Sequence, residues 1–190
     1  MIENNYKPPF TITSKILSTV SDIVEIVTEL KHLDNSYSTL QLRKTSRIKT
    51  ITGTLQIEGN TLTEEKITAI LQGKRVLGTT KELAEVQGAI QAYDKLVTFD
   101  YKDISHLLGA HKLLMSDILT NAGSFRKKAV GVFAENGVSH IAPPANRVLE
   151  LMEQLFSWLE TTKEHPLIVS SVFHYEFEFI HPFIDGNGRM

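Results

Sequence analysis

The chain has 190 residues, 42% of them hydrophobic and 22% charged, with a formal net charge of −2 at pH 7. These values are ordinary for a globular protein with a substantial core, and the near balance of charge argues against direct binding to nucleic acid. The absence of cysteine excludes disulfides and zinc–thiolate sites, and without a secretory signal or a long apolar run we expect a cytoplasmic protein that has no membrane contact.

Apolar residues recur with the spacing of α-helices along most of the chain. We expect helices over residues 13–32, 38–58, 63–72, 80–98, 103–120, 144–161 and 167–180. The first carries one apolar stripe, which we expect to pack in the core; it contains Ile16, Val20, Ile23, Val24, Val27 and Leu30. The expected fold class is all-α, a mainly helical bundle with one short β-hairpin.

The second helix is expected to end at an unfavourably placed charge. Gly59 is suited to terminate the helix, which puts Glu58 at the negative pole of the helix dipole. The local cost is about 0.3–1 kcal/mol. An exposed glutamate beside a turn is common, but a residue that breaks a local rule is also a candidate for function.

One segment predicts β structure. Asn136 and Gly137 form a strong hairpin-turn signal, and valines alternate with small residues before it. By itself this pattern predicts an ordinary surface hairpin. The basic residues that precede it are expected to form a solvated run; they are Arg126, Lys127 and Lys128.

The last ten residues gather the groups that phosphate chemistry needs. Histidine accepts a proton near neutral pH, a carboxylate holds Mg2+, glycines let backbone N–H groups converge on an anion, and a guanidinium binds phosphate oxygens. Asp-Gly-Asn-Gly alone is typical of a surface turn, but a turn needs neither the histidine nor the arginine. The set therefore indicates a site for a nucleoside triphosphate and its metal; it comprises His181, Asp185, Gly186, Asn187, Gly188 and Arg189.

Residues 181–189 resemble the signature of the Fic family, His-Pro-Phe-x-(Asp/Glu)-Gly-Asn-Gly-Arg-x-x-Arg. The resemblance implies a Fic-like bundle and an enzyme that moves AMP from ATP to a Ser, Thr or Tyr hydroxyl of a target protein, or of itself. It further implies these roles: His181 as general base, Asp185 as the Mg2+ ligand, Gly186, Asn187 and Gly188 as the anion hole, and Arg189 as a phosphate ligand. A lysine replaces the second motif glycine in the branch that transfers phosphate, and Gly188 disfavours that branch.

A second motif lies upstream. Thr54, Glu58 and Gly59 match the family's inhibitory pattern, (Ser/Thr)-x-x-x-Glu-(Gly/Asn). This resemblance implies the subclass with an N-terminal brake, in which Glu58 pairs with the second motif arginine and blocks a productive ATP pose. In some relatives the same glutamate positions water to remove AMP, so both roles stay open. The hairpin resembles the family's flap over the nucleotide, formed here by Val130, Gly131 and Val132.

The resemblance divides the chain into an N-terminal helical region, 1–75, with the inhibitory motif, and a Fic-like core, 76–190. The second motif arginine would fall at position 192, so we expect a core that is cut short after the motif. It is open whether 190 residues suffice for turnover, which protein is the target and what the oligomeric state is. The alternatives are a non-catalytic nucleotide-binding or regulatory module and transfer of another phosphate-containing group.

Overall fold

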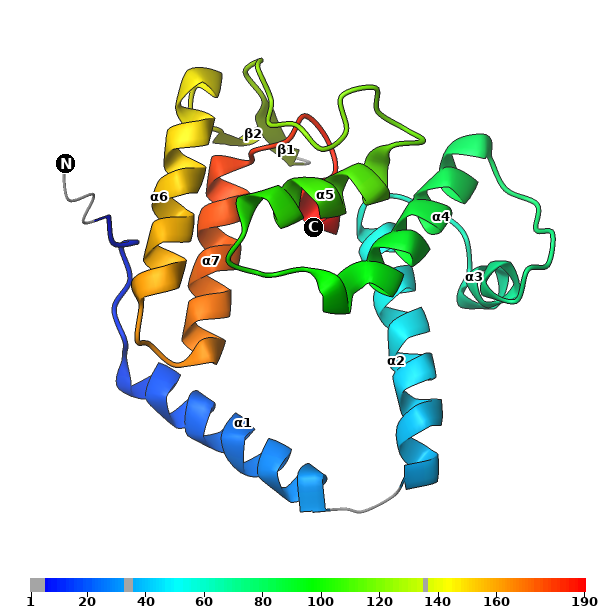
Figure 1. Cartoon of the computed structure of the whole chain (residues 1–190), viewed down its shortest axis with the longest axis horizontal. Helices are drawn as coiled ribbons and strands as arrows, with labels where there is room; N and C mark the ends of the chain where they lie inside the picture. The colour runs from blue at the N-terminus through cyan, green and yellow to red at the C-terminus, as the bar shows by residue number, and fades with distance from the viewer. Residues whose placement is uncertain (1–5, 33–35, 135–136) are drawn as a thin grey trace.

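The computed structural model of the chain describes residues 6–32, 36–134 and 137–190, with the side chains of 32, 36–41 and 132–140 outside the description. The fold is mainly helical, which confirms the expected class (Figure 1). The helices are α1 (Ser14–His32), α2 (Ser36–Ile57), α3 (Glu64–Leu71), α4 (Thr80–Lys95), α5 (Ile104–Met115), α6 (Val148–Thr161) and α7 (Pro166–Ile180). None of these helices, within the described residues, has the length and apolarity needed to cross a membrane.

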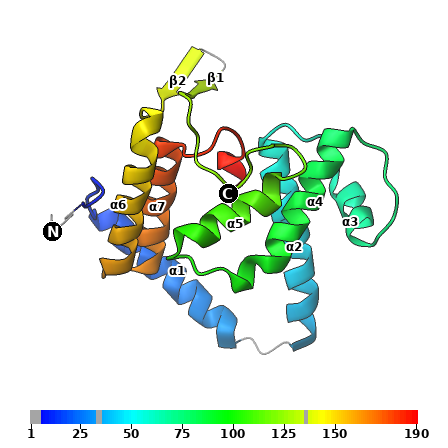
Figure 2. The ribbon, with the colours of Figure 1, turned by 45° about the horizontal axis from the view of Figure 1, so that its top comes forward.

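Two short strands form an antiparallel ladder. β1 (Gly131–Ala134) pairs with β2 (Gly137–Ile141), with a register shift between Val132 and Phe133. The strands occupy the segment in which the sequence predicts a hairpin, while residues 135–136, including half of the turn signal, lie outside the described residues. In both ribbon views the ladder lies at the end of the molecule where α6 begins and α7 ends (Figures 1 and 2).

Local signals account for where the helices begin. Thr79 and Glu82 form a reciprocal capping box at α4, and Asp103 caps α5 by accepting a hydrogen bond from the Ser105 N–H. Pro166 occupies the first turn of α7, where a missing N–H leaves no hydrogen bond unmade. These starts therefore follow from the sequence itself.

The apolar side chains form two clusters. The first joins α2, α3, α4 and α5; its buried members are Ile51, Leu55, Leu62, Ile67, Val86, Ala89, Ile90, Leu114 and Met115. The second joins α6, α7 and the segment after α7; its buried members are Val148, Met152, Leu155, Phe156, Trp158, Leu159, Phe177, Ile180 and Phe183. Because α5 contributes Met115 to the first cluster and packs Leu107 on the second, it ties the two halves together.

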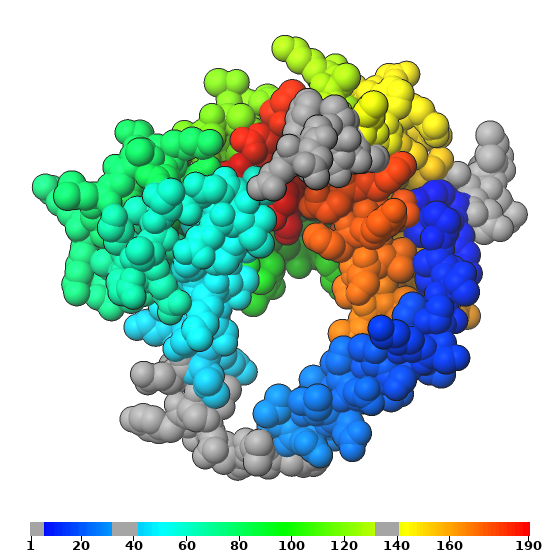
Figure 3. All heavy atoms as spheres, turned by 180° about the vertical axis from the view of Figure 1, so that it is seen from behind, coloured from blue at the N-terminus to red at the C-terminus, as the bar shows by residue number. Residues whose placement is uncertain are grey.

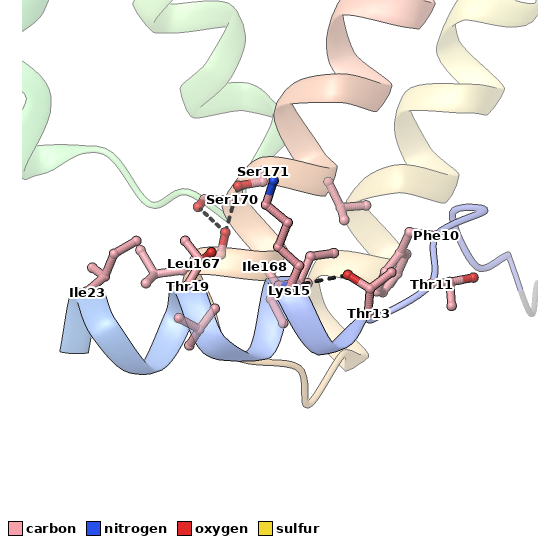
Figure 4. A pocket seen from close by; sticks show the side chains of 13 residues that line it. Phe10, Thr11, Thr13, Lys15, Thr19, Ile23, Leu167, Ile168, Ser170 and Ser171 are labelled. Carbon is pink, nitrogen blue, oxygen red and sulfur yellow. Dashed lines mark hydrogen bonds between the residues drawn. The ribbon is translucent and has the colours of Figure 1, made fainter. Parts of the chain in front are cut away.

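The apolar stripe of α1 does not pack in the core, contrary to the sequence prediction. Ile23, Val24, Val27 and Leu30 are 38–59% exposed. The first turns of α1 border a groove of about 420 Å³ shared with the start of α7 (Figure 4), and a space-filling view shows a hollow between the rest of α1, α2 and α7 (Figure 3). The prediction was wrong because periodicity marks an apolar face without specifying what covers it.

Candidate functional site

The segment after α7, residues 181–190, carries the predicted motif and is called the motif loop below. His181 is the C-terminal cap of α7 and has a left-handed backbone, with φ 49° and ψ 63°. Its N–H still donates to the Phe177 carbonyl at 2.8 Å, which fixes the residue at the helix end. The ring Nδ1 lies 3.6 Å from Glu178 Oε2, and the side chain is 21% exposed. The backbone of His181 is thus fixed at the helix end, and its side chain remains partly accessible.

Arg126 anchors the start of the motif loop through hydrogen bonds to main-chain carbonyls. It is only 2% exposed, so the expectation of a solvated basic run is wrong for this residue, although Lys127 and Lys128 are exposed. Its Nε donates to the His181 carbonyl at 2.8 Å, and its Nη2 donates to the Ile180 carbonyl at 3.2 Å. The last carbonyls of a helix lack partners and carry partial negative charge, which explains why a cation is buried there.

Three further contacts of Arg126 extend this anchor. Nη1 donates to the Lys128 carbonyl at 3.0 Å and Nη2 to the Pro143 carbonyl at 2.6 Å, while the backbone N–H donates to the Pro182 carbonyl at 2.9 Å. Burial lowers the pKa of the Arg126 guanidinium, which nevertheless stays charged at neutral pH. One side chain therefore fixes the end of α7 and the segments that flank the hairpin.

Asn187 braces the motif loop internally. Its Oδ1 accepts from the Phe183 N–H and its Nδ2 donates to the Phe183 carbonyl, both at 2.9 Å. The Asn187 side chain therefore binds within the loop, and the backbone N–H groups remain candidates for the predicted anion hole. Gly186 has φ 87°, a conformation that favours glycine, and a Cβ there would lie 2.9 Å from Met115 Sδ.

His111, which the sequence did not single out, supports the loop from α5. Its ring stacks on Phe183 with centroids 3.7 Å apart. Nδ1 accepts from the Gly123 N–H at 2.8 Å, and Nε2 lies 3.0 Å from the Asp185 carbonyl. Since a carbonyl oxygen only accepts, the hydrogen-bond network assigns the proton to Nε2 of a neutral ring. Burial lowers the His111 pKa, and the charge of Arg189 acts in the same direction.

Arg189 contacts three carboxylates, two of them from distant segments of the chain. Nη1 lies 2.9 Å from Glu85 Oε1, and Nη2 lies 2.6 Å from Asp185 Oδ1 and 3.9 Å from Glu58 Oε2. The side chains of Arg189 and Glu85 are 3% and 4% exposed, whereas those of Glu58 and Asp185 are 28% and 39% exposed. The structure thus unites three predicted site residues and adds Glu85, which the sequence analysis missed.

The Glu58 carboxylate lies directly over Gly188. A Cβ placed on Gly188 would overlap Glu58 Oε1. Gly59 ends α2 with φ 86°, and its N–H donates to the Gln56 carbonyl at 3.0 Å, as expected of a helix-terminating glycine. Thr54 lies one turn earlier in α2 and is half-buried. An anionic group therefore already lies against the segment that was predicted to bind phosphate.

The donor set suits a metal that arrives with a phosphate ligand. Among the described residues there is no group of three or more His, Cys, Asp or Glu side chains arranged to hold an ion. The Asp185 carboxylate is partly exposed, and its Oδ1 also accepts from the Gly186 N–H at 2.6 Å. Mg2+ is typically bound by one or two carboxylates together with substrate phosphates, so Asp185 fits this ion.

The described contacts of the predicted flap residues do not include Arg189 or its three carboxylate partners. Val130 and Gly131 are half-buried where β1 begins, and the side chain of Val132 lies outside the described residues. No hydrogen bond or ion pair given for the described residues joins Val130 or Gly131 to Arg189, Glu85, Asp185 or Glu58.

Known proteins resemble the chain in sequence and in fold. Residues 101–190 match the model of the Fic/DOC family. The curated protein adenylyltransferase fic-1 of Caenorhabditis briggsae is 29% identical over 94% of this chain and 36% of its own length, and protein adenylyltransferase Fic of Drosophila mojavensis is 26% identical over 89% and 37%. The crystal structure of a Fic family protein from Desulfovibrio desulfuricans G20 has a TM-score of 0.90 and 48% identity, covering 97% of this chain and 57% of that chain. The chain thus spans little more than a third of these curated relatives.

Proposed function

Residues 101–190 form a Fic/DOC family domain, and on this premise we propose that the chain is a protein adenylyltransferase, which moves AMP from ATP to a hydroxyl side chain of a target protein. The observation that carries the proposal is the convergence of Arg189, Asp185 and Glu58 at one point of the motif loop, which begins at His181. The curated relatives, which are protein adenylyltransferases, and the solved Fic structure support it.

The proposed reaction assigns one task to each group. His181 accepts the proton of the target hydroxyl, whose oxygen then forms a bond to the α-phosphorus of ATP. The bond between the α-phosphorus and the bridging oxygen breaks, and pyrophosphate leaves. Arg189 and the backbone N–H groups of 186–188 bind phosphate oxygens. Asp185 would hold Mg2+, which supplies neutralisation of phosphate charge.

Glu58 is the proposed brake. Its carboxylate lies over Gly188 and 3.9 Å from Arg189 Nη2, so it competes with a phosphate for the same donors. Like charges repel, so an ATP phosphate enters this place only when Glu58 moves away. The second role, in which Glu58 positions water to remove AMP from a modified target, remains a further proposal for the same carboxylate.

Three finer assignments are also proposals. Residues 1–75 would supply the brake, and residues 76–190 would supply the catalytic core. The hairpin would act as a flap, in which the backbone of β1 pairs with an extended segment of the target. The acceptor is a Ser, Thr or Tyr hydroxyl of another protein or of this chain.

A non-catalytic nucleotide-binding module is the second candidate function. It is favoured by one observation: Glu58 is one of three carboxylates around Arg189, and in this position it would hold the site shut against a productive pose of ATP. Transfer of another phosphate-containing group is disfavoured by Gly188, which replaces the lysine of the phosphate-transferring branch.

The test uses ATP labelled on one phosphate at a time. The Glu58→Gly protein is incubated with Mg2+, candidate target proteins and ATP labelled at the α- or the γ-phosphate. Protein-bound label from α-labelled ATP alone is the expected result. Label from γ-labelled ATP would indicate phosphate transfer, and ATP binding with no bound label would favour the module.

A further inference from the structure

We infer that Glu85 is a positioning residue of the proposed nucleotide site: one of its oxygens holds Arg189 and the other holds Asn60, two residues after Glu58. The inference rests on the proposed function. It concerns how the phosphate-binding arginine and the brake are held at a fixed separation.

The geometry places Glu85 between two segments that approach it from different directions. Its Oε1 accepts from Arg189 Nη1 at 2.9 Å, and its Oε2 accepts from Asn60 Nδ2 at 2.9 Å. Glu85 lies in α4, Arg189 in the motif loop, and Asn60 between α2 and α3. Glu85 and Asn60 are 3% and 5% exposed, so water does not compete for these hydrogen bonds.

Asn60 is itself fully committed, so the contact fixes its whole segment. Its Nδ2 also donates to the Glu82 carbonyl at 3.2 Å, its Oδ1 accepts from the Leu62 N–H at 3.0 Å, and its backbone N–H donates to the Leu55 carbonyl at 3.0 Å. Only Gly59 separates Asn60 from Glu58. Movement of the Glu85 carboxylate would therefore be transmitted to Arg189 on one side and to the base of the Glu58 side chain on the other.

Positioning explains this buried charge better than stability does. A buried ion pair often contributes less to stability than well-packed apolar residues would, because both charges lose their hydration. Glu85 instead holds one edge of a planar guanidinium and fixes its orientation. Nη2, on the other edge, then faces Asp185 and Glu58, and this is the nitrogen that a phosphate would take over from Glu58.

The test is a double-mutant cycle on Mg2+-ATP binding, measured by calorimetry in the Glu58→Gly protein. We expect Glu85→Gln to weaken binding by about tenfold, as is typical when a coupled contact is cut. Combined with Arg189→Gln, it is expected to weaken binding no further than Arg189→Gln alone. Glu153→Gln is the matched control, because it makes the same chemical change at an exposed glutamate of α6.

Several outcomes would overturn the inference. Unchanged binding in Glu85→Gln, or losses that simply add to those of Arg189→Gln, would show that Glu85 acts only on the fold. Thermal unfolding checks that each variant is folded; if Glu85→Gln is not, Glu85→Asp replaces it, since the shorter side chain keeps the charge but withdraws the oxygens. The Glu58→Gly protein failing to bind ATP at all would sink the proposed function as well, whereas binding without label transfer would sink only the catalytic proposal.

Discussion

The Glu58 carboxylate lies 3.9 Å from the Arg189 guanidinium and directly over Gly188. The ion pair joins the end of α2 to the motif loop. The Glu58 side chain is 28% exposed, and Arg189 keeps its ion pairs with Glu85 and Asp185 when Glu58 moves away. The contact is the one on which the proposed brake depends, and this leads to the first prediction.

Replacing Glu58 by glycine is expected to raise AMP transfer by about tenfold or more, within the range typical of coupling between sites. The substitution frees Nη2 of Arg189 for a phosphate. The increase in AMP transfer is measured as the rate at which label from α-labelled ATP becomes bound to protein, both in this chain and in one extended past position 192. Glu58→Gln keeps the bulk and loses the charge, so an intermediate rate is expected; lower transfer in Glu58→Gly than in the parent would refute the brake.

Removing the imidazole of His181 is expected to lower AMP transfer by about 10²–10⁴-fold, the usual contribution of a general base. His181 has a left-handed backbone, so His181→Asn is a useful companion to His181→Ala, because asparagine tolerates this conformation. Both variants should remain folded by thermal unfolding. Transfer at the parent rate in either variant would contradict the assignment.

Arg126→Ala is expected to reduce the free energy of unfolding by about 3 kcal/mol, because carbonyls that now bind a charged donor would be left buried and unpaired. Urea unfolding measures the change. Lys127→Ala is the matched control: it is exposed and should change stability by less than about 0.5 kcal/mol. Equal effects of the two substitutions would mean that the anchor is unimportant.

The stability of the fold should depend on pH through His111. Burial holds its pKa below the ordinary value of 6.5 in the folded chain, so the unfolded chain binds more protons as the pH falls. The contribution of the neutral His111 ring to the free energy of unfolding is complete above about pH 6.5. It is lost as the pH falls through the lowered pKa of His111 in the folded chain. Between about pH 7.5 and 5, His111→Asn should therefore lose less stability than the parent in urea unfolding; an identical loss would contradict the prediction.

The sequence predicts most helix positions because their signals are local. The helix expected over 167–180 is α7, Pro166–Ile180, set by a proline start and a clear apolar period. The helix expected over 103–120 ends earlier, at Met115. The apolar pattern continues past Met115 because Ile118 and Leu119, which lie after the helix, still pack on the first cluster. Apolar spacing does not distinguish a helix from a turn whose side chains are partly buried.

The residues of the candidate site also differ in whether the sequence could predict them. The residues from His181 to Arg189 are neighbours in sequence, so their chemistry could be interpreted together. Glu85 is 104 positions from Arg189, and no local rule connects the two. The available signal was a glutamate one turn before Ala89, on the buried face of an amphipathic helix, where a charge requires a partner.

The Arg126 anchor has a consequence for how freely its surroundings can vary. All four acceptors of its side chain are main-chain oxygens, which every amino acid supplies. Substitutions at Ile180, Lys128 or Pro143 that keep the backbone path would leave the anchor intact, whereas no other side chain offers the same fork of donors as Arg126. Substitutions are thus tolerated at the residues whose carbonyls accept these hydrogen bonds, whereas Arg126, which donates them, cannot be replaced.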